Sequence, residues 1–371
     1  MKRIGAIVLA VLLLLPTFAA VQPLQAQAAA PIRVLAIGHS YSNNATELIG
    51  DIIESMGLEG KLEVYSLYYA GCSLNQHVSF YENNQAVYEL RLNGRNVKGT
   101  GGMMTMQEAF AYKAYDYVTL QQEPGQAAVY SSFEPALGQL AAIVRREEPR
   151  AKLQIHQTWA FCKSCASGGH AYGVFDYPSS DAMFAEIEKA YATAADKLGE
   201  TGIIPCGEAI QLAKKRGYYD GHNPNAHDDV MQCANNALYA DNIDHLNQRG
   251  KYLTACVWIE HYLGADTREA TFVSSVLDED DCAKLRQIAH EVVTGDTSAY
   301  KPKTTAGKQT TTTKQSVTSG ATTTTANTPV EDDASGQPDN TMLIILIAAI
   351  GGGVLLLGGI VVTIVVLLKK K

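Results

Sequence analysis

Between Pro31 and Gly295, short apolar runs typical of β-strands alternate with segments whose apolar residues recur at helical spacing. The first run, 34–37, is apolar throughout, as expected for a strand that is covered on both faces. This alternation favours a parallel sheet with helices on both faces. The region therefore predicts one α/β domain, and its roughly 265 residues suffice for a single sizeable core.

The positions of the elements follow from these patterns. Strands are expected at 34–37, 62–67, 116–120, 153–157 and 202–205. A first helix is expected at 48–56, with Asn44 as its N-cap and Gly57 as its stop. Further helices are expected at 133–146, 181–198, 208–216 and, as the last one, 248–263. Asn93-Gly94, inside the alternating segment 88–97, predicts an inserted β-hairpin.

The N-terminal segment predicts export. Residues 1–30 combine the basic pair Lys2-Arg3 with an apolar run and the small-x-small sequence Ala26-Gln27-Ala28. A basic start, a short apolar run and such a cleavage site are typical of a signal peptide. We therefore expect the domain at 31–296 to lie outside the cytoplasm.

The C-terminal segments predict a membrane anchor. Residues 342–368 carry no charged side chain and are long enough to cross a bilayer as one transmembrane helix. The lysines at 369–371 would stay in a cytoplasmic tail. The Thr-rich, low-complexity segment 297–341 predicts a disordered stalk. The expected location is the bacterial cell surface, as a single-pass membrane protein with an extracellular N-terminal domain.

The charge balance argues against nucleic-acid binding. The chain has 38 acidic and 30 basic residues and a net charge of -8. Five of the basic residues belong to the terminal segments, so the expected domain is more acidic still. An acidic surface repels phosphate backbones, and no basic cluster compensates for it. We expect no nucleic-acid partner.

Two distant segments could meet to form a catalytic site. Ligands of open parallel sheets bind beyond the carboxyl ends of the strands, and Ser40 follows the first strand directly. A serine nucleophile needs an imidazole base, and the imidazole needs an acceptor that fixes its tautomer. His245 precedes the last expected helix, and both Asp241 and Asp244 are candidates for that acceptor. The alternative interpretation is a helix-capping serine and a surface histidine.

Several short segments resemble the blocks of the SGNH/GDSL hydrolase superfamily, particularly a bacterial branch catalogued as a domain of unknown function. The resembling segments span 33–263, and they include Gly38-His39-Ser40, Ala70-Gly71-Cys72, Leu120-Gln121-Gln122, Thr158-Trp159-Ala160 and His245-Leu246-Asn247. The resemblance implies the three-layer, flavodoxin-like SGNH hydrolase fold with a central parallel sheet.

The resemblance also implies residue roles. Ser40 would be the nucleophile and His245 the general base. The backbone N–H groups of Ser40 and Gly71 would line the oxyanion hole. The family's third-block asparagine is absent, so Gln122, or alternatively Gln121, would donate in its place.

A second difference from the superfamily pattern leaves open which residue is the triad acid. The superfamily places aspartate three residues before the histidine, and Asn242 stands there in this chain. The acid would then be Asp241 or, alternatively, Asp244.

The expected function is that of a surface-tethered serine esterase. It would hydrolyse small acyl esters, carried by small molecules or by carbohydrate or cell-wall glycan, through an acyl-enzyme and without a cofactor. The missing asparagine and the shifted aspartate motivate an alternative, a non-catalytic cell-surface glycan-binding module on a decayed SGNH fold. An O-acyltransferase that uses the same triad is the other alternative.

Seven cysteines lie in the part of the chain that is expected to be exported. Cys162 and Cys165, flanked by His156 and His170, have a spacing that could hold zinc. A disulfide or redox pair is a second interpretation, and unremarkable thiols are the favoured one. No metal ligand is assigned.

Overall fold

The computed structural model describes residues 30–97, 102–162, 177–199, 202–223, 225–241 and 243–301. They belong to the first of two compact units, Met1–Thr304. The predicted signal peptide up to residue 29, the stalk from residue 302 onward and the transmembrane helix lie outside the described residues. Within those residues, no helix combines the length and the apolar character that a membrane crossing needs.

The described part of the chain is built on one sheet with the strand order β4-β3-β2-β1-β5-β6-β7. The parallel strands are β1 (Ile32–Gly38), β2 (Leu62–Tyr68), β5 (Tyr117–Leu120), β6 (Lys152–His156) and β7 (Ile203–Ile204). Numbered among themselves, these strands follow the order 2-1-3-4-5, which is that of flavodoxin-like sheets. The predicted α/β class and the predicted strands are confirmed, and the sheet is mostly rather than wholly parallel.

The antiparallel part of the sheet is the hairpin predicted at Asn93-Gly94. β3 (Glu89–Leu92) pairs antiparallel with β2, and β4 (Arg95–Asn96) pairs with β3. Asn93 and Gly94 both have positive φ angles, 46° and 77°, as a two-residue turn of this kind requires. The Asn93 side chain also accepts from Val64 N–H and donates to the Leu62 carbonyl, which fastens the turn to β2.

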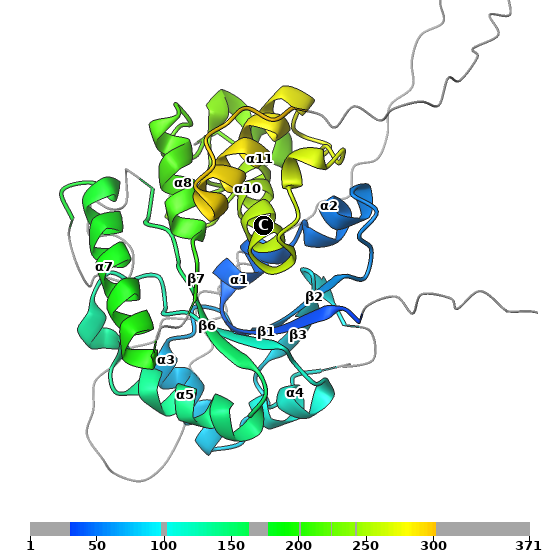
Figure 1. Ribbon diagram of the computed structural model, residues 1–371. Helices are drawn as coiled ribbons and strands as arrows, with labels where there is room; N and C mark the ends of the chain where they lie inside the picture. Colours follow the sequence, from blue (N-terminus) through cyan, green and yellow to red (C-terminus); the bar gives the residue numbers. More distant parts are fainter. Residues whose placement is uncertain are drawn as a thin grey trace, which may run out of the picture. The chain divides into compact units, whose positions relative to one another are not determined.

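Helices cover both faces of the sheet (Figure 1). One group consists of α1 (Ser40–Thr46), α2 (Ile49–Ser55), α8 (Cys206–Lys215), α10 (Gln248–Leu263) and α11 (Glu279–Thr294). The other consists of α3 (Leu74–Glu82), α4 (Met106–Tyr112), α5 (Ala136–Glu147) and α7 (Ser180–Leu198). Shorter helical turns are η1 (Tyr130–Phe133), α9 (Asp229–Gln232), η2 (Ala234–Asn236) and η3 (Thr267–Glu269).

The helix predicted at 48–56 is confirmed as α2, but its predicted N-cap is wrong and the helix before it, α1, was not predicted. The chain forms a helix as early as Ser40, because the His39 side chain caps α1 by accepting from Tyr41 N–H. Asn44, the expected N-cap, therefore lies inside α1. A second helix, α2, then ends just before Gly57, which has a φ of 67° and fits the predicted stop.

The prediction that α10 is the last helix is also wrong. Asp278 caps a further helix, α11, by accepting from Asp281 N–H. α10 is buried on almost every side, because it packs between the sheet and α11 and also contacts α1, α2 and α8. The loop that carries His245 leads directly into this central helix, so the position of His245 is set by the core.

Candidate active site

The structure brings Ser40 and His245 together. The Ser40 hydroxyl oxygen lies 3.0 Å from His245 Nε2, although 205 residues separate the two. Ser40 is the first residue of α1, at the carboxyl end of β1. His245 lies in a hairpin-like loop, closed by the backbone bonds Ala240 N–H to His245 O (2.8 Å) and Asn247 N–H to Leu238 O (3.0 Å). The contact therefore lies at the end of the sheet where ligands bind in open α/β folds.

Asp241 shapes this loop and orients the imidazole. Its Oδ1 accepts from the backbone N–H groups of Ile243, Asp244 and His245, at 3.0, 2.8 and 3.1 Å. Its Oδ2 lies 2.6 Å from His245 Nδ1. Because an ionised carboxylate can only accept, Nδ1 carries the proton and Nε2 is free to take one from Ser40. Asp241 thus reaches His245 from four residues upstream, one residue further than the superfamily pattern.

Asp244, the alternative acid, is also in contact with His245. Its Oδ1 lies 3.1 Å from the same Nδ1, and only 4% of its side chain is exposed, against 36% for Asp241. Burial raises the pKa of Asp244 to about 6. Burial alone would also raise the pKa of Asp241, but hydrogen bonds from His245 and the backbone hold it below its usual value. The hydrogen bond to Asp241 raises the pKa of His245.

His39 fixes the turn that carries Ser40. It is fully buried; its Nδ1 accepts from Tyr41 N–H (3.4 Å), and its Nε2 lies 3.0 Å from the Gln122 carbonyl. These partners require a neutral ring with the proton on Nε2. Burial accordingly lowers the pKa of His39 to about 4. His39 was not predicted as a site residue, and its place next to Ser40 was the only sequence signal for it.

Two further side chains, which were not predicted as site residues, contact the loop that carries His245. Asn44 Oδ1 accepts from Leu246 N–H at 2.9 Å. Trp159 Nε1 donates to the Asp244 carbonyl at 2.7 Å, and its ring stacks on Tyr41 with centroids 4.0 Å apart. The Thr158-Trp159-Ala160 resemblance was the only sequence signal for Trp159.

Gln122 does not offer its amide to an oxyanion in this arrangement. It is fully buried, and its Nε2 donates to the carbonyl and the hydroxyl of Ser132, at 2.8 and 3.2 Å. Its Oε1 accepts from Leu74 N–H at 3.1 Å. The predicted donor is thus engaged elsewhere, because the side chain points toward the start of α3 and η1. The alternative, Gln121, is buried as well, and its amide lies close to Gly38 and Ser42.

The two backbone groups predicted for the oxyanion hole are in a suitable region. Tyr69 N–H donates to Gly38 O at 3.4 Å, so the loop that carries Gly71 starts beside the end of β1. Gly71 has a φ of 58°, which a glycine adopts without strain. Among the described residues, neither Ser40 N–H nor Gly71 N–H has a hydrogen-bond acceptor. Both groups are thus available to a ligand, and their role stays a prediction.

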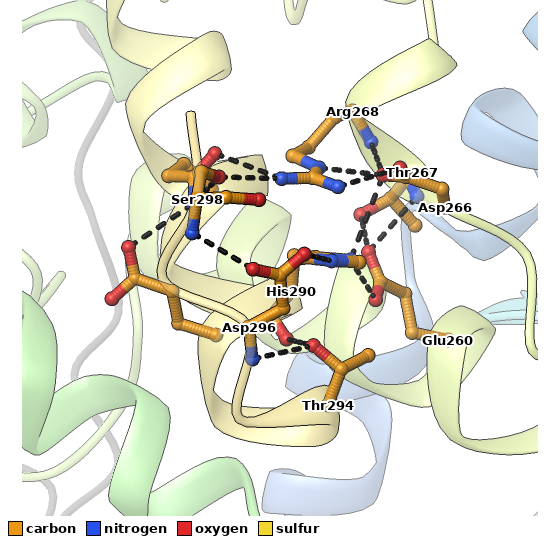
Figure 2. Close-up of polar contacts among 10 residues, drawn as sticks. Glu260, Asp266, Thr267, Arg268, His290, Thr294, Asp296 and Ser298 are labelled. Carbon is orange, nitrogen blue, oxygen red and sulfur yellow. Dashed lines mark hydrogen bonds and ion pairs between the residues drawn. The ribbon is translucent and has the colours of Figure 1, made fainter. Parts of the chain in front are cut away.

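A second cluster of acids and a histidine lies near the other end of α10 (Figure 2). His290 Nδ1 is 2.9 Å from Glu260 Oε2, whose other oxygen accepts from the backbone and hydroxyl of Thr267. Both carboxylate oxygens of Asp266 accept hydrogen bonds from the Arg268 guanidinium. Since these ligand atoms already have protein partners, the cluster is explained as a structural network.

The proposed zinc spacing cannot be assembled from the described residues. Cys165 and His170 lie outside them, while His156 and Cys162 are both buried. His156 packs against Trp159 and Trp258, with ring centroids at 6.3 and 5.1 Å. Five other cysteines are buried thiols, Cys72, Cys206, Cys233, Cys256 and Cys282.

A family model described as a domain of unknown function, DUF4886, matches residues 33–292. The chain belongs to this family. A DUF4886 family protein from Bacteroides uniformis has a solved structure that is 27% identical, with a TM-score of 0.59. The alignment covers 72% of this chain and 96% of that one. No curated protein matches this DUF4886 chain.

Solved structures of named enzymes also resemble this DUF4886 protein. The acetyl xylan esterase AlAXEase is 13% identical with a TM-score of 0.40, covering 62% of this chain and 100% of its own. A member of the lipolytic protein G-D-S-L family from Veillonella parvula is 12% identical with a TM-score of 0.35, covering 63% and 100%. The predicted membership in a family catalogued as a domain of unknown function is therefore confirmed.

Proposed function

We propose that this DUF4886 protein is a serine ester hydrolase. The observation that carries the proposal is the hydrogen-bonded series from Ser40 Oγ to His245 Nε2 (3.0 Å) and from His245 Nδ1 to Asp241 Oδ2 (2.6 Å). Nucleophile, base and orienting acid stand within contact distance in the order that acyl transfer needs. The shifted aspartate, which motivated the binding-module alternative, still lies within reach of the histidine.

In the proposed mechanism, Ser40 Oγ attacks the carbonyl carbon of an ester while His245 Nε2 takes its proton. The negative charge on the carbonyl oxygen would rest on the N–H groups of Ser40 and Gly71. His245 then gives its proton to the leaving alcohol, and the acyl group stays on Ser40. A water molecule, deprotonated by His245, attacks the acyl carbon; the bond to Ser40 Oγ then breaks, His245 returns the proton to that oxygen, and the acid leaves. Asp241 keeps the imidazole oriented throughout.

We further propose that the substrates are small O-acyl groups on carbohydrate or cell-wall glycan. This finer proposal is supported by the SGNH/GDSL resemblance and by the terminal segments, which predict a domain tethered at the cell surface. An enzyme held there by a stalk would meet glycan esters before other substrates. Release of acetate from acetylated xylan and from O-acetylated peptidoglycan, compared with simple aryl acetates, would test the preference.

The activity itself is tested with the full-length protein and p-nitrophenyl acetate. Ser40→Ala is expected to lower kcat/KM by about 10⁴- to 10⁶-fold, because it removes the nucleophile. Ser131→Ala, at an exposed serine, serves as the control and should keep full activity. A fluorophosphonate probe should label the wild type at Ser40 and leave Ser40→Ala unlabelled. Equal turnover by the wild type and Ser40→Ala would contradict the proposal.

A further inference from the structure

We propose that Asp244 is a second positioning residue for His245, so that a pair of carboxylates shares the Nδ1 proton. This inference rests on the proposed function and deepens it. A single orienting acid is enough for a catalytic triad, so a second carboxylate at the same nitrogen calls for its own explanation. The two carboxylates approach Nδ1 at 2.6 and 3.1 Å, and the longer contact is still of hydrogen-bond length.

The two acids are held by different parts of the fold. Asp241 binds the backbone of its own loop through Oδ1, and its side chain is partly exposed. Asp244 is held from the sheet side, because Trp159 donates to its carbonyl and Trp159 in turn stacks on Tyr41. Asp244 N–H also donates to Asp241 Oδ1, an oxygen that an amide at position 241 would keep, so the position of Asp244 does not require the carboxylate charge of Asp241. It can keep its contact with His245 when that charge is removed.

Few ionisable groups surround the two carboxylates, and they include both acids and a base. Asp244 is faced by His245 and Asp241 within the loop, by Tyr41 from α1, by Glu123 after β5 and by Tyr239 from the hairpin. The Tyr41 hydroxyl lies close enough to Asp244 to affect its pKa, although it lacks a fully formed hydrogen bond among the described residues.

The environment of the base contains both signs of charge. His245 is faced by Asp241 and Asp244, by Lys251 from α10 and by His39 before α1. Of these groups, the two aspartates raise the pKa of His245 and Lys251 lowers it. The negative charge of Asp244 therefore acts directly on the group that must be neutral to serve as a base.

Two kinetic consequences follow. Asp241→Asn keeps an amide oxygen for the loop backbone, and His245 Nδ1–H can still donate to Asp244. We expect this variant to lose about 10- to 100-fold in kcat/KM, whereas loss of the only orienting acid costs about 10⁴-fold in a serine protease triad. The double variant Asp241→Asn/Asp244→Asn should show that larger loss. Asp244→Asn alone should lose less than about tenfold, because Asp241 remains.

The pH profile separates positioning from a structural role. His245 must be neutral to act, so kcat/KM rises with pH through the pKa of His245. Asp244→Asn removes a charge that raises this pKa, so the rising limb should move to lower pH. Asp196→Asn, the same substitution at an exposed position, is the matched control and should leave the limb in place.

The inference can be tested without turnover. In the Ser40→Ala background, ¹⁵N NMR of His245 should show a lower imidazole pKa when Asp244→Asn is added. An unchanged His245 pKa, or a double variant no slower than Asp241→Asn, would overturn the role of Asp244. Failure of the esterase proposal is seen separately, as turnover that survives Ser40→Ala. Circular dichroism of each variant checks that the fold is intact.

Discussion

At the scale of single residues, Gln122 forms hydrogen bonds to several separate parts of the candidate site. A donor in an oxyanion hole would not need so many partners. Its carbonyl accepts from His39, which precedes Ser40, and its N–H donates to the Tyr191 hydroxyl at 3.1 Å. Its side chain binds Leu74 at the start of α3 and Ser132 in η1. A buried residue of this kind fixes the relative positions of the Ser40 turn and the Gly71 loop.

We therefore expect Gln122→Ala to destabilise the protein by about 2–4 kcal/mol, because it leaves a cavity and strips buried N–H and C=O groups of their partners. Urea unfolding at neutral pH measures the change. Gln139→Ala, at an exposed position of α5, is the control and should unfold at nearly the wild-type urea concentration. A stability of Gln122→Ala equal to that of this control would show that the observed bonds contribute nothing net.

Some residues of the candidate site could be predicted from the sequence, and others could not. Ser40 and His245 could be found because their residue types and flanking segments carry the chemistry. The direction of Gln122 could not be found, since neighbouring side chains after a strand point to opposite faces and only packing decides which amide meets which partner. Whether Asp241, Asp244 or both contact His245 could not be predicted either, because it depends on the conformation of the loop. Three backbone N–H bonds to Asp241 determine that conformation.

At the scale of elements, the candidate active site lies where α1 meets the loop before α10. Asn44, inside α1, holds that loop through Leu246 N–H. The same loop is continuous with the buried helix α10, which packs directly on α1. The distance between Ser40 and His245 therefore depends on how these two elements are fastened together.

Loss of the hydrogen bond between Asn44 and Leu246 N–H should weaken the contact between Ser40 and His245. We expect Asn44→Ala to lower kcat/KM by about 10- to 100-fold, because a small misplacement of a catalytic group costs that much. Asn44→Asp keeps an acceptor for Leu246 N–H and should lose less. Asn96→Ala, exposed on β4, is the control for kinetics with p-nitrophenyl acetate. Equal rates for Asn44→Ala and this control would show that Asn44 does not help to position His245.

Elements were predictable where a long signal was available. The buried parallel strands form apolar runs, and each was predicted near its observed place. The helices α3 and α4 were missed because they are short and are defined mainly by capping boxes, Ser73 with Gln76 and Thr105 with Glu108. α11 was missed although its buried residues recur along one face, because its charged first turn obscured that periodicity.

At the scale of the whole molecule, three histidines of the described residues, His39, His77 and His156, are completely buried in the core of an acidic protein. Burial lowers the pKa of His39 to about 4 and that of His77 and His156 to about 3. The unfolded chain binds protons on these groups below about pH 6.5, whereas the folded chain does not. Their neutral burial is therefore harmless above pH 6.5 and destabilising below it.

We expect the free energy of unfolding to fall as the pH is lowered from about 7 to about 4.5, by up to about 1.4 kcal/mol per pH unit for each such histidine. Urea unfolding across this range measures the slope. His156→Leu should make the slope shallower, since neither ring nitrogen of His156 has a hydrogen-bond partner among the described residues. His227→Gln, at an exposed position, should leave it unchanged. Equal slopes for His156→Leu and the wild type would contradict the assignment.

The predicted extent of the folded domain, 31–296, stays a prediction, and the family match spans 33–292. The C-terminal boundary was placed where the composition changes abruptly from apolar periodic segments to a Thr-rich stretch. The signal peptide, the stalk and the transmembrane helix stay predictions, because they concern residues outside the described ranges.

The network around His290 has a mechanical consequence for the point where the chain leaves the domain (Figure 2). Ser298 O accepts from Arg268 and from Gln287, at 2.9 and 3.1 Å, and Thr294 bonds back to the His290 carbonyl. Tension applied beyond Tyr300 would be borne first by these bonds at α11 and η3. The hairpin that carries His245 enters α10 at its opposite end, so these bonds would separate the contact between Ser40 and His245 from such strain.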